Sequence, residues 1–208
     1  MVSNLTEKKD ALQMVAFDLF GVILSEGHLI SRVLMSLLPD DADKKWVKKQ
    51  YEAFNVGDIS EKEFWNAINV DEYTELRNTF INSFELDPDV NATVKVLKEN
   101  YQLCILSNYP ADWADMMSEI FAFKDNFNPC LFSGYVNCKK PEPEIYQKLI
   151  SQTGLNPNQI IFIDDRLENL QAAYDQGMKT VYYHRDDEKH QFVADYQIKK
   201  LIELTQIL

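Results

Sequence analysis

Short apolar runs alternate with segments of helical periodicity through the second half of the chain, and this alternation limits the fold more than any other feature. The predicted strands lie at 14–18, 102–107, 128–134, 159–164 and 179–183, and the predicted helices of this half at 88–101, 111–123, 143–154 and 167–177. Strands that alternate with helices pair into a parallel sheet with helices on both faces. We therefore predict an α/β fold with a Rossmann-like, doubly wound parallel sheet. Residues 188–208 are predicted to form a terminal helical segment.

Between the first strand and residue 88, the sequence has helical periodicity and no convincing strand. Helices are expected at 27–39, 44–57, 58–68 and 71–84. Ser60 and Glu63 have the spacing of a capping box at the start of the third helix. A helical block inserted after the first strand is typical of a cap domain, so we predict a core of residues 1–25 and 88–208 and a helical cap of residues 26–87. Five aromatic residues of the cap are expected to be mostly core, with one or two facing a substrate cavity: Trp46, Tyr51, Phe54, Phe64 and Trp65.

The overall composition excludes several classes of function. A net charge of −12 argues against nucleic acid or an anionic membrane surface as a partner. No apolar run reaches the length of about 18 residues that a membrane span requires. The three cysteines lack the spacing of a metal site and are expected to be reduced thiols. We expect a cytoplasmic monomer of 208 residues that acts on a small molecule.

Polar residues follow three of the predicted strands, at the edge of the sheet where ligands of open α/β folds bind. The first strand ends at Asp18, another at Ser107 with Asn108 behind it, and a later one at Asp164 and Asp165. Each of these has an ordinary structural role when taken alone, such as a turn residue or a helix cap. Lys140 and Pro141 could likewise form a solvated turn. The expected convergence at one rim is what makes them candidates for a site.

Two adjacent aspartates at the end of a buried strand require an explanation. Their negative charges would raise the pKa of at least one of them unless a cation lies nearby. Carboxylate oxygens are ligands that suit Mg²⁺. Asp164 and Asp165 therefore predict a magnesium site.

Four motifs in order resemble the haloacid dehalogenase-like hydrolase superfamily: FDLFGVI, ILSN, KKPEPEIY and FIDDRLENLQAA. The helical block from about 26 to 87 is similar to the small cap of a subgroup that includes sugar-1-phosphate phosphatases and the N-terminal phosphatase domains of soluble epoxide hydrolases. The resemblance implies a Mg²⁺-dependent phosphatase acting on a small phosphorylated metabolite. Asp18 would form an aspartyl-phosphate, the covalent route that is open to a carboxylate.

The resemblance also implies roles for the other residues. Mg²⁺ would bind Asp18, the backbone carbonyl of Phe20 and Asp165, with Asp164 as a further ligand or as a support behind the ligands. Ser107 and the Asn108 backbone would bind the phosphate. Lys140 would neutralise charge on the nucleophile and the phosphate, and Asn169 is expected either to orient Lys140 or a carboxylate or to serve the helix. Arg166 and Arg185 are expected either near the site or in solvent.

Phe20 departs from the pattern of the family's phosphatases, which carry Asp at this position. That Asp protonates the leaving group and then activates water, so its loss costs about 10²- to 10⁴-fold in rate. Substrates with a good leaving group should suffer least. Two other functions stay open. One is a 2-haloacid dehalogenase, whose family members carry an aromatic Tyr here but lack the paired acids. The other is a non-catalytic binding protein with this fold.

Overall fold

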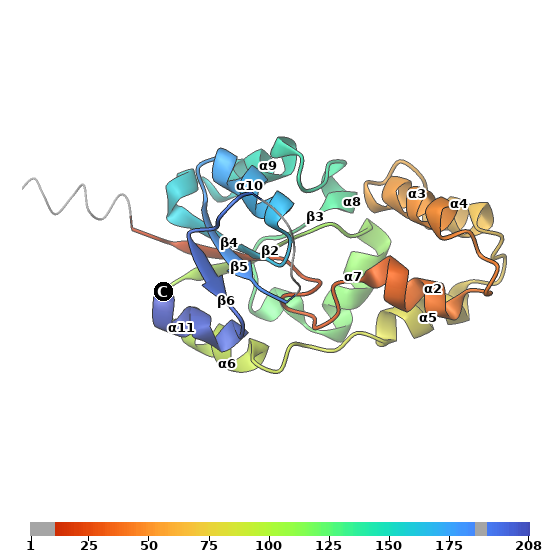
Figure 1. The fold of residues 1–208 in the computed structure, drawn as a ribbon, viewed down its shortest axis with the longest axis horizontal. Helices are drawn as coiled ribbons and strands as arrows, with labels where there is room; N and C mark the ends of the chain where they lie inside the picture. Colours follow the sequence, from red (N-terminus) through yellow and green to blue (C-terminus); the bar gives the residue numbers. More distant parts are fainter. Residues whose placement is uncertain (1–10, 186–190) are drawn as a thin grey trace, which may run out of the picture.

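The computed structural model describes residues 11–185 and 191–208, and its centre is a six-stranded parallel sheet (Figure 1). The strand order is β3-β2-β1-β4-β5-β6, which places the first strand between the second and the fourth. The strands are β1 Met14–Phe17, β2 Gln102–Ser107, β3 Cys130–Phe132, β4 Ile160–Asp164, β5 Lys179–Tyr183 and β6 Tyr196–Ile198. The predicted α/β class and parallel sheet are confirmed.

Helices cover both faces of this sheet because side chains alternate along each strand. In β1, Val15 and Phe17 belong to one hydrophobic cluster and Met14 and Ala16 to another. The first cluster packs against α6 (Val90–Leu97), α7 (Ala111–Ile120) and α11 (Leu204–Ile207), and the second against α9 (Pro143–Thr153) and α10 (Leu167–Asp175). A strand that is buried on both faces reads as a continuous apolar run, which is why these strands were visible in the sequence.

The segment between β1 and α6 is helical, as predicted, and extends away from the sheet (Figure 1). It consists of η1 (Leu29–Leu34), a π-helix that continues into α2 (Met35–Leu37), and of α3 (Lys44–Asn55), α4 (Glu61–Ala67) and α5 (Thr74–Asn82). The expected capping box is present, since the Ser60 hydroxyl accepts from the Glu63 N–H at 3.3 Å and the Glu63 carboxylate accepts from the Ser60 N–H at 2.8 Å. We keep the name cap for residues 26–87, and its boundaries stay a prediction.

Aromatic rings join the cap to the core. Trp113 of α7 is fully buried and contacts five rings of the cap, those of Tyr51, Phe54, Phe64, Trp65 and Phe80. The cap aromatics are thus buried as expected, with Trp46 as the exception at 43% exposure. The indole N–H of Trp46 donates to the Ala67 carbonyl at 2.7 Å, so this side chain ties two cap helices together at the surface.

The prediction of a terminal helical segment was wrong for part of its length. Residues 196–198 form strand β6, which pairs in parallel with β5, and only η4 (Leu201–Glu203) and α11 are helical. The main-chain groups along the edge of β5 give this short segment hydrogen-bonding partners that its own sequence pattern does not reveal. Residues 188–190 of the predicted helix lie outside the described residues. Within 11–185 and 191–208, no helix has both the length and the apolar character to span a membrane.

Short helical turns complete the described elements. They are η2 (Phe123–Asp125), α8 (Ser133–Val136) and η3 (Pro157–Gln159). The loop between α8 and α9 carries Lys140 toward the carboxyl ends of the central strands. This loop therefore completes the rim on which the candidate residues meet.

Candidate active site

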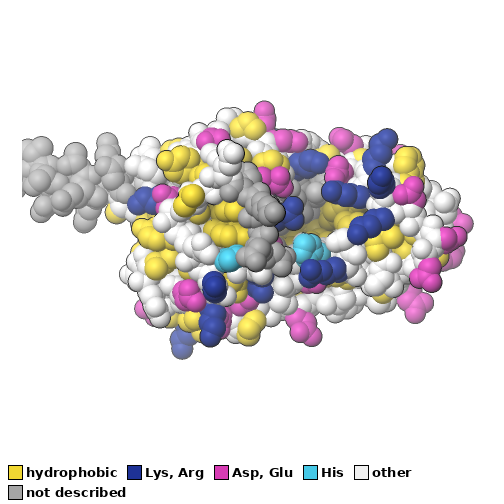
Figure 2. All heavy atoms as spheres, viewed as in Figure 1, with side chains coloured by type: hydrophobic (Ala, Val, Ile, Leu, Met, Phe, Trp, Pro, Cys, Tyr) yellow, Lys and Arg dark blue, Asp and Glu magenta, His cyan; other side chains and the backbone are white. Residues whose placement is uncertain are grey.

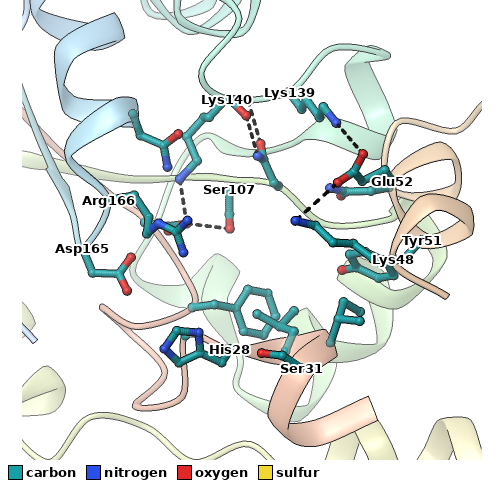
Figure 3. Close-up of a pocket in the computed structure, with 18 of the residues that line it drawn as sticks. His28, Ser31, Lys48, Tyr51, Glu52, Ser107, Lys139, Lys140, Asp165 and Arg166 are labelled. Carbon is teal, nitrogen blue, oxygen red and sulfur yellow. Dashed lines mark hydrogen bonds and ion pairs between the residues drawn. The ribbon is translucent and has the colours of Figure 1, made fainter. Parts of the chain in front are cut away.

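The strand order brings the predicted polar residues together at one end of the sheet. Asp18 follows β1, Ser107 ends β2 and Asp164 ends β4, and β1 lies between the other two strands. The carboxyl ends of parallel neighbours share an edge, so these side chains meet although they are far apart in the sequence. Lys140 reaches the same place from its loop (Figure 3).

Asp18 is held by three short hydrogen bonds to one of its oxygens. Oδ1 accepts from the Leu19 N–H at 2.6 Å, from the Ser107 hydroxyl at 2.7 Å and from the Lys140 ammonium at 2.8 Å. The residue is only 7% exposed, so the orientation of the carboxylate is fixed by buried, charge-assisted contacts. The three contacts all end on Oδ1, and Oδ2 takes no part in them.

Asp164 lies behind Asp18 and is completely buried. Its Oδ2 accepts from the Lys140 ammonium at 2.7 Å, and its Oδ1 accepts from the Arg166 backbone N–H at 2.8 Å. The amide of Asn169 donates to both oxygens, at 3.1 and 3.0 Å. Asp164 thus orients Lys140 through Oδ2, and Asn169 orients Asp164 in turn.

Asp165 faces the cavity, and two glycines make room for its carboxylate. A Cβ at Gly21 would lie 2.4 Å from Asp165 Oδ2, and one at Gly27 would lie 2.9 Å from the same atom. Gly21 also has a φ of +81°, which side chains other than glycine rarely adopt. A larger residue at either position would therefore displace the Asp165 carboxylate from its present place. Oxygens of Asp18, Asp164 and Asp165 lie within 4.8 Å of one another.

The charges of this cluster explain its altered pKa values. Burial, followed by the negative charges of Asp164 and Asp18, raises the pKa of Asp165 to about 8. Burial also raises the pKa of Asp164 to about 6, against the lowering effect of Lys140. Burial opposes the charge of Lys140, yet Asp164 and Asp18 hold its pKa above the usual value. Lys140 and the more exposed Arg166 do not balance three carboxylates, and this donor set fits a divalent cation such as Mg²⁺.

Asn108 has a contact that sequence reasoning missed. Its side-chain amide donates to the Lys140 carbonyl at 2.8 Å and accepts from the Lys140 N–H at 2.8 Å. This paired contact fixes the main chain at Lys140, which sends its side chain to Asp18 and Asp164. The role expected for the Asn108 backbone, a contact with phosphate, stays a prediction.

Phe20 lines the cavity with its ring turned into an apolar pocket. The side chain is 5% exposed, and its ring lies 5.1 Å from Phe84 and 4.7 Å from Tyr109 between centroids. The position at which related phosphatases place an acid is therefore occupied by a buried aromatic group. The ring has no proton to give to a leaving group.

Arg185 was expected either near the site or in solvent, and the structure places its side chain among protein groups. Its guanidinium donates to the Gly21 carbonyl at 2.7 Å, pairs with the buried Asp87 and lies 4.3 Å above the Tyr183 ring. The Tyr183 hydroxyl donates to the same Asp87 at 2.9 Å. Arg185 thus supports the glycine turn beside Asp165 from the end of β5. The Arg166 side chain lies 3.7 Å from Glu168.

A cavity of about 510 Å³ opens in front of these residues, and the cap supplies its other side. Figure 3 shows Asp165, Ser107 and Lys140 across an open space from Lys48 and Tyr51. The cap residues that line the cavity belong to η1, to the segment before it and to α3: Gly27, His28, Leu29, Ile30, Ser31, Lys44, Lys48, Tyr51, Glu52 and Asn55. Apart from Tyr51, which was among the aromatics expected to face a cavity, none was singled out from the sequence. They belong to no motif, and the face of a helix that lines a cavity has the same periodicity as one that meets solvent.

Comparison with known proteins places the chain in a family. A family model described as haloacid dehalogenase-like hydrolase matches residues 12–176. Bifunctional epoxide hydrolase 2 of Mus musculus is 33% identical over 104 residues, which are 47% of this chain and 18% of the mouse protein. Glyceraldehyde 3-phosphate phosphatase of Pyrococcus furiosus is 27% identical over 152 residues, which are 69% of this chain and 62% of the archaeal protein. The chain thus spans less than two thirds of the length of both relatives.

Dehalogenases are also similar to this chain. (S)-2-haloacid dehalogenase 4A of Burkholderia cepacia is 23% identical over 221 residues and covers 96% of both chains. A phosphatase structure from Thermococcus onnurineus superposes with a TM-score of 0.70 at 24% identity, covering 94% of this chain and 97% of that one. The L-2-haloacid dehalogenase of Xanthobacter autotrophicus reaches 0.72 at 15% identity, covering 94% and 98%. These two structures show the fold alone, and the fold does not separate the two activities.

The match of the family model over most of the chain agrees with the parallel sheet and with the meeting of four motifs at one rim. The chain belongs to the haloacid dehalogenase-like hydrolase family.

Proposed function

We propose that this chain is a Mg²⁺-dependent phosphatase that acts on a small phosphorylated metabolite through an aspartyl-phosphate. The observation that carries the proposal is the cluster of Asp18, Asp164 and Asp165 within 4.8 Å, with the pKa of Asp165 raised to about 8. Negative charge in such excess over Lys140 is costly unless a cation shares the site. A reaction that brings a further anion to this place needs that cation even more.

Asp18 is the proposed nucleophile. The three hydrogen bonds to Oδ1 leave Oδ2 as the oxygen that would attack phosphorus. The new O–P bond forms as the bond from phosphorus to the leaving oxygen breaks. Water then attacks the phosphorus of the acyl phosphate, which releases inorganic phosphate and restores the Asp18 carboxylate.

The neighbouring residues position and neutralise these groups. Asp18, Asp165 and the backbone carbonyl of Phe20 would hold Mg²⁺, with Asp164 in support. The bound cation would draw the phosphate toward Asp18 and offset its negative charge. Lys140 offsets charge beside Asp18, and its position is fixed by Asp164 and by the main-chain contacts to Asn108. The Ser107 hydroxyl, which donates to Asp18 at 2.7 Å, would turn its one hydrogen to a phosphate oxygen when the substrate binds. Positioning and charge neutralisation are what phosphoryl transfer requires.

Phe20 limits the substrates that this site would turn over. It supplies no proton to the leaving oxygen and no base for water, so the leaving group must depart without that help. Aryl phosphates, acyl phosphates and sugar-1-phosphates should therefore be hydrolysed faster than simple alkyl phosphates. This preference is a property of the chain's own site and does not depend on the identity of the natural substrate.

A Mg²⁺ titration of aryl phosphate hydrolysis tests the proposal. We expect 4-nitrophenyl phosphate to be hydrolysed with Mg²⁺ and not in EDTA, and we expect Asp18→Asn to abolish the reaction. Trapping the phosphoenzyme with a labelled substrate, followed by peptide mapping to Asp18, would identify the intermediate. If no activated phosphate were hydrolysed, with or without Mg²⁺, the proposal would be rejected.

A 2-haloacid dehalogenase is the second candidate, and two observations favour it. The residue two positions after Asp18 is aromatic, and the Burkholderia cepacia dehalogenase aligns with 96% of this chain. The ring of Phe20 lies in an apolar pocket beside the nucleophile, which would suit a carbon–halogen bond. Against this stands the carboxylate cluster, which a metal-independent reaction does not need. Chloride release from (S)-2-chloropropionate in EDTA would reverse our choice.

A further inference from the structure

The cavity is larger than a phosphate group requires, and its far wall differs in charge from the rest of the protein. Its volume of about 510 Å³ is in the range of sites that take whole metabolites. The wall opposite Asp18 and Asp165 comes from α3 of the cap and from the loop that precedes Lys140 (Figure 3). We call this surface the cap wall and define it by Lys44, Lys48, Tyr51, Glu52 and Lys139.

Positive charge prevails on the cap wall, although the chain carries a net charge of −12. Figure 2 shows several Lys and Arg side chains, in dark blue, on the cap side of this face. Lys44 and Lys48 are one helical turn apart on α3, so they present their ammonium groups on the same face. Lys139 adds a third cation from the core. The wall contains one acid, Glu52, which lies 3.9 Å from Lys48 and 3.8 Å from Lys139. One carboxylate shared between two lysines leaves the wall with an excess of positive charge.

The ion pairs of Glu52 with Lys48 and Lys139 contribute little to the stability of the fold. The Lys48 and Glu52 side chains are 69% and 48% exposed, and both distances are near the outer limit for an ion pair. Exposed pairs of this kind contribute little to stability because water screens them and the long side chains lose freedom. Figure 3 shows the Lys48 side chain directed into the open space. Lys48 is therefore available to a ligand at small cost.

Tyr51 supplies an independent observation at the same place. The residue is only 7% exposed and lines the cavity, yet its hydroxyl has no hydrogen-bond partner among residues 11–185 and 191–208. A buried hydroxyl without a partner costs free energy, and a ligand oxygen in the cavity would remove that cost. In Figure 3, Tyr51 lies on the same side of the open space as Lys48, and its hydroxyl end points toward that space. The cap wall thus combines ammonium groups with a neutral donor, the set that recognises an oxyanion.

We propose that the cap wall binds a second oxyanion of the substrate, a carboxylate or a second phosphate, while the first phosphate lies at Asp18. This inference rests on the proposed function and names its substrate class: a phosphorylated metabolite with another anionic group at its far end. Lys48 and Tyr51 are the primary contacts, and Lys44 and Lys139 support them.

Two aryl phosphates of nearly equal size test this inference. The substrates are 4-carboxyphenyl phosphate and 4-carbamoylphenyl phosphate, which differ in the charge of the remote group, and kcat/KM is measured for both with saturating Mg²⁺. We expect the carboxylate compound to be preferred by about tenfold, the effect of one hydrogen bond to a charged group. A third substrate, 1,4-phenylene bisphosphate, shows whether a phosphate serves better than a carboxylate as the remote group.

Variants assign the preference to the cap wall. Lys48→Gln should lower the preference at least threefold, and Tyr51→Phe should raise KM for the carboxylate compound more than it lowers kcat. The matched control is Lys45→Gln, which removes the same charge from an exposed position of α3 that does not line the cavity. This control should leave the preference unchanged. The preference is the ratio of kcat/KM for the carboxylate compound to kcat/KM for the carbamoyl compound. Dividing this ratio in each variant by the ratio in the wild type cancels the difference between the two leaving groups.

The outcomes separate the inference from the function on which it rests. Hydrolysis of both compounds with equal kcat/KM would overturn the second oxyanion site and leave the phosphatase proposal intact. An equal loss of preference in Lys45→Gln and Lys48→Gln would also overturn it, because the effect would then come from overall charge. If none of the three compounds were hydrolysed with Mg²⁺, the proposed function would fall and the inference with it.

Discussion

The core wall of the cavity holds its charges through short, buried contacts, whereas the cap wall holds its charges through long, exposed ones. The core wall is the side of the cavity formed by Asp18, Ser107, Lys140 and Asp165. Lys140 lies 2.8 Å from Asp18 and 2.7 Å from Asp164, with 1% of its side chain exposed. Lys48 lies 3.9 Å from Glu52, with 69% of its side chain exposed. A buried network fixes atoms for a reaction, while exposed lysines adapt to the ligand that arrives. The difference fits the proposed function, in which the core residues carry the reaction and the cap residues select the substrate.

The largest effect should come from the nucleophile itself. Asp18→Asn keeps the size of the side chain but removes the charge, and we expect kcat to fall by about 10⁴-fold or more. Asp175→Asn, a change of the same charge at an exposed position of α10, serves as control. Thermal melting monitored by circular dichroism checks that both variants fold. Substantial activity in Asp18→Asn would show that the core wall is not where the reaction occurs.

The second effect tests whether a general acid is the only catalytic group that the core wall lacks. Phe20→Asp should raise kcat on an alkyl phosphate by at least about tenfold, because a general acid is restored beside Asp18. The same change removes a buried ring that contacts Phe84 and Tyr109, so it should cost about 3–5 kcal/mol of stability. Phe20→Leu, which removes the ring without adding an acid, should give no gain. Equal kcat values in the two variants at a temperature where both are folded would count against the assignment of this position.

Asn169 tests how far the buried network extends. Asn169→Ala removes both hydrogen bonds to Asp164, which in turn orients Lys140. We expect kcat to fall about tenfold with little change in KM, since residues that orient a metal or catalytic group have effects of about 10- to 100-fold. Gln171→Ala lies two residues further along α10 and should have no such effect. A change in KM alone would mean that Asn169 acts on binding.

The pH dependence of stability tests the buried charges of the core wall. The pKa of the Asp165 carboxyl rises from its ordinary value of 3.8 to about 8 in the folded protein. Between about pH 4 and pH 8 the folded state therefore binds more protons than the unfolded state, and the stability of the metal-free protein falls as pH rises through this window. Mg²⁺ should offset that loss. We expect the gain in Tm from Mg²⁺ to be larger at pH 8 than at pH 5 by about 3 °C, roughly 1 kcal/mol for a chain of this size.

Differential scanning calorimetry in EDTA and in Mg²⁺ at the two pH values measures this difference. Asp165→Asn removes the titrating group and should make the Mg²⁺ effect small at both. An equal gain in Tm at pH 5 and pH 8 in the wild type would contradict the account of the cluster.

The smallest effect concerns the cap wall. Tyr51→Phe removes a hydroxyl that has no partner among the described residues, so no protein hydrogen bond is lost. We expect the free energy of unfolding to stay the same or to rise by up to about 1 kcal/mol. Urea unfolding of the ligand-free protein measures it. A loss of more than about 1 kcal/mol would show that the hydroxyl serves the fold and not a ligand.

The sequence predicted the core wall far better than the cap wall. Asp18, Ser107 and Asp164 each end an apolar run, and the rule that ligands bind at the carboxyl ends of strands predicts that these residues meet. Lys44 and Lys48 had no such rule to identify them, because a lysine on the polar face of a helix looks the same whether it meets solvent or a cavity. The position of the cap over the sheet decides between the two, and this depends on tertiary packing.

The same limit applies to the ends of elements. Strand β6 contains three residues, too few for a period to be visible, and it forms because the edge of β5 offers main-chain partners. The contact between Asn108 and the main chain of Lys140 was equally hidden, since it joins residues 32 positions apart. Local pattern indicates which segments become strands and helices, but not which side chains are drawn together by the loops.

The partly buried carboxylate of Glu61 has a consequence for how the molecule unfolds. It accepts from the indole N–H of Trp65 in the cap at 3.1 Å and from that of Trp113 in the core at 2.8 Å. Cap and sheet also share one hydrophobic cluster, which contains Phe64 and Trp65 together with Val15 and Phe17. The predicted boundary near residues 26 and 87 therefore does not separate two units that would fold independently. Neither fragment would keep its aromatic residues out of water if the chain were cut there.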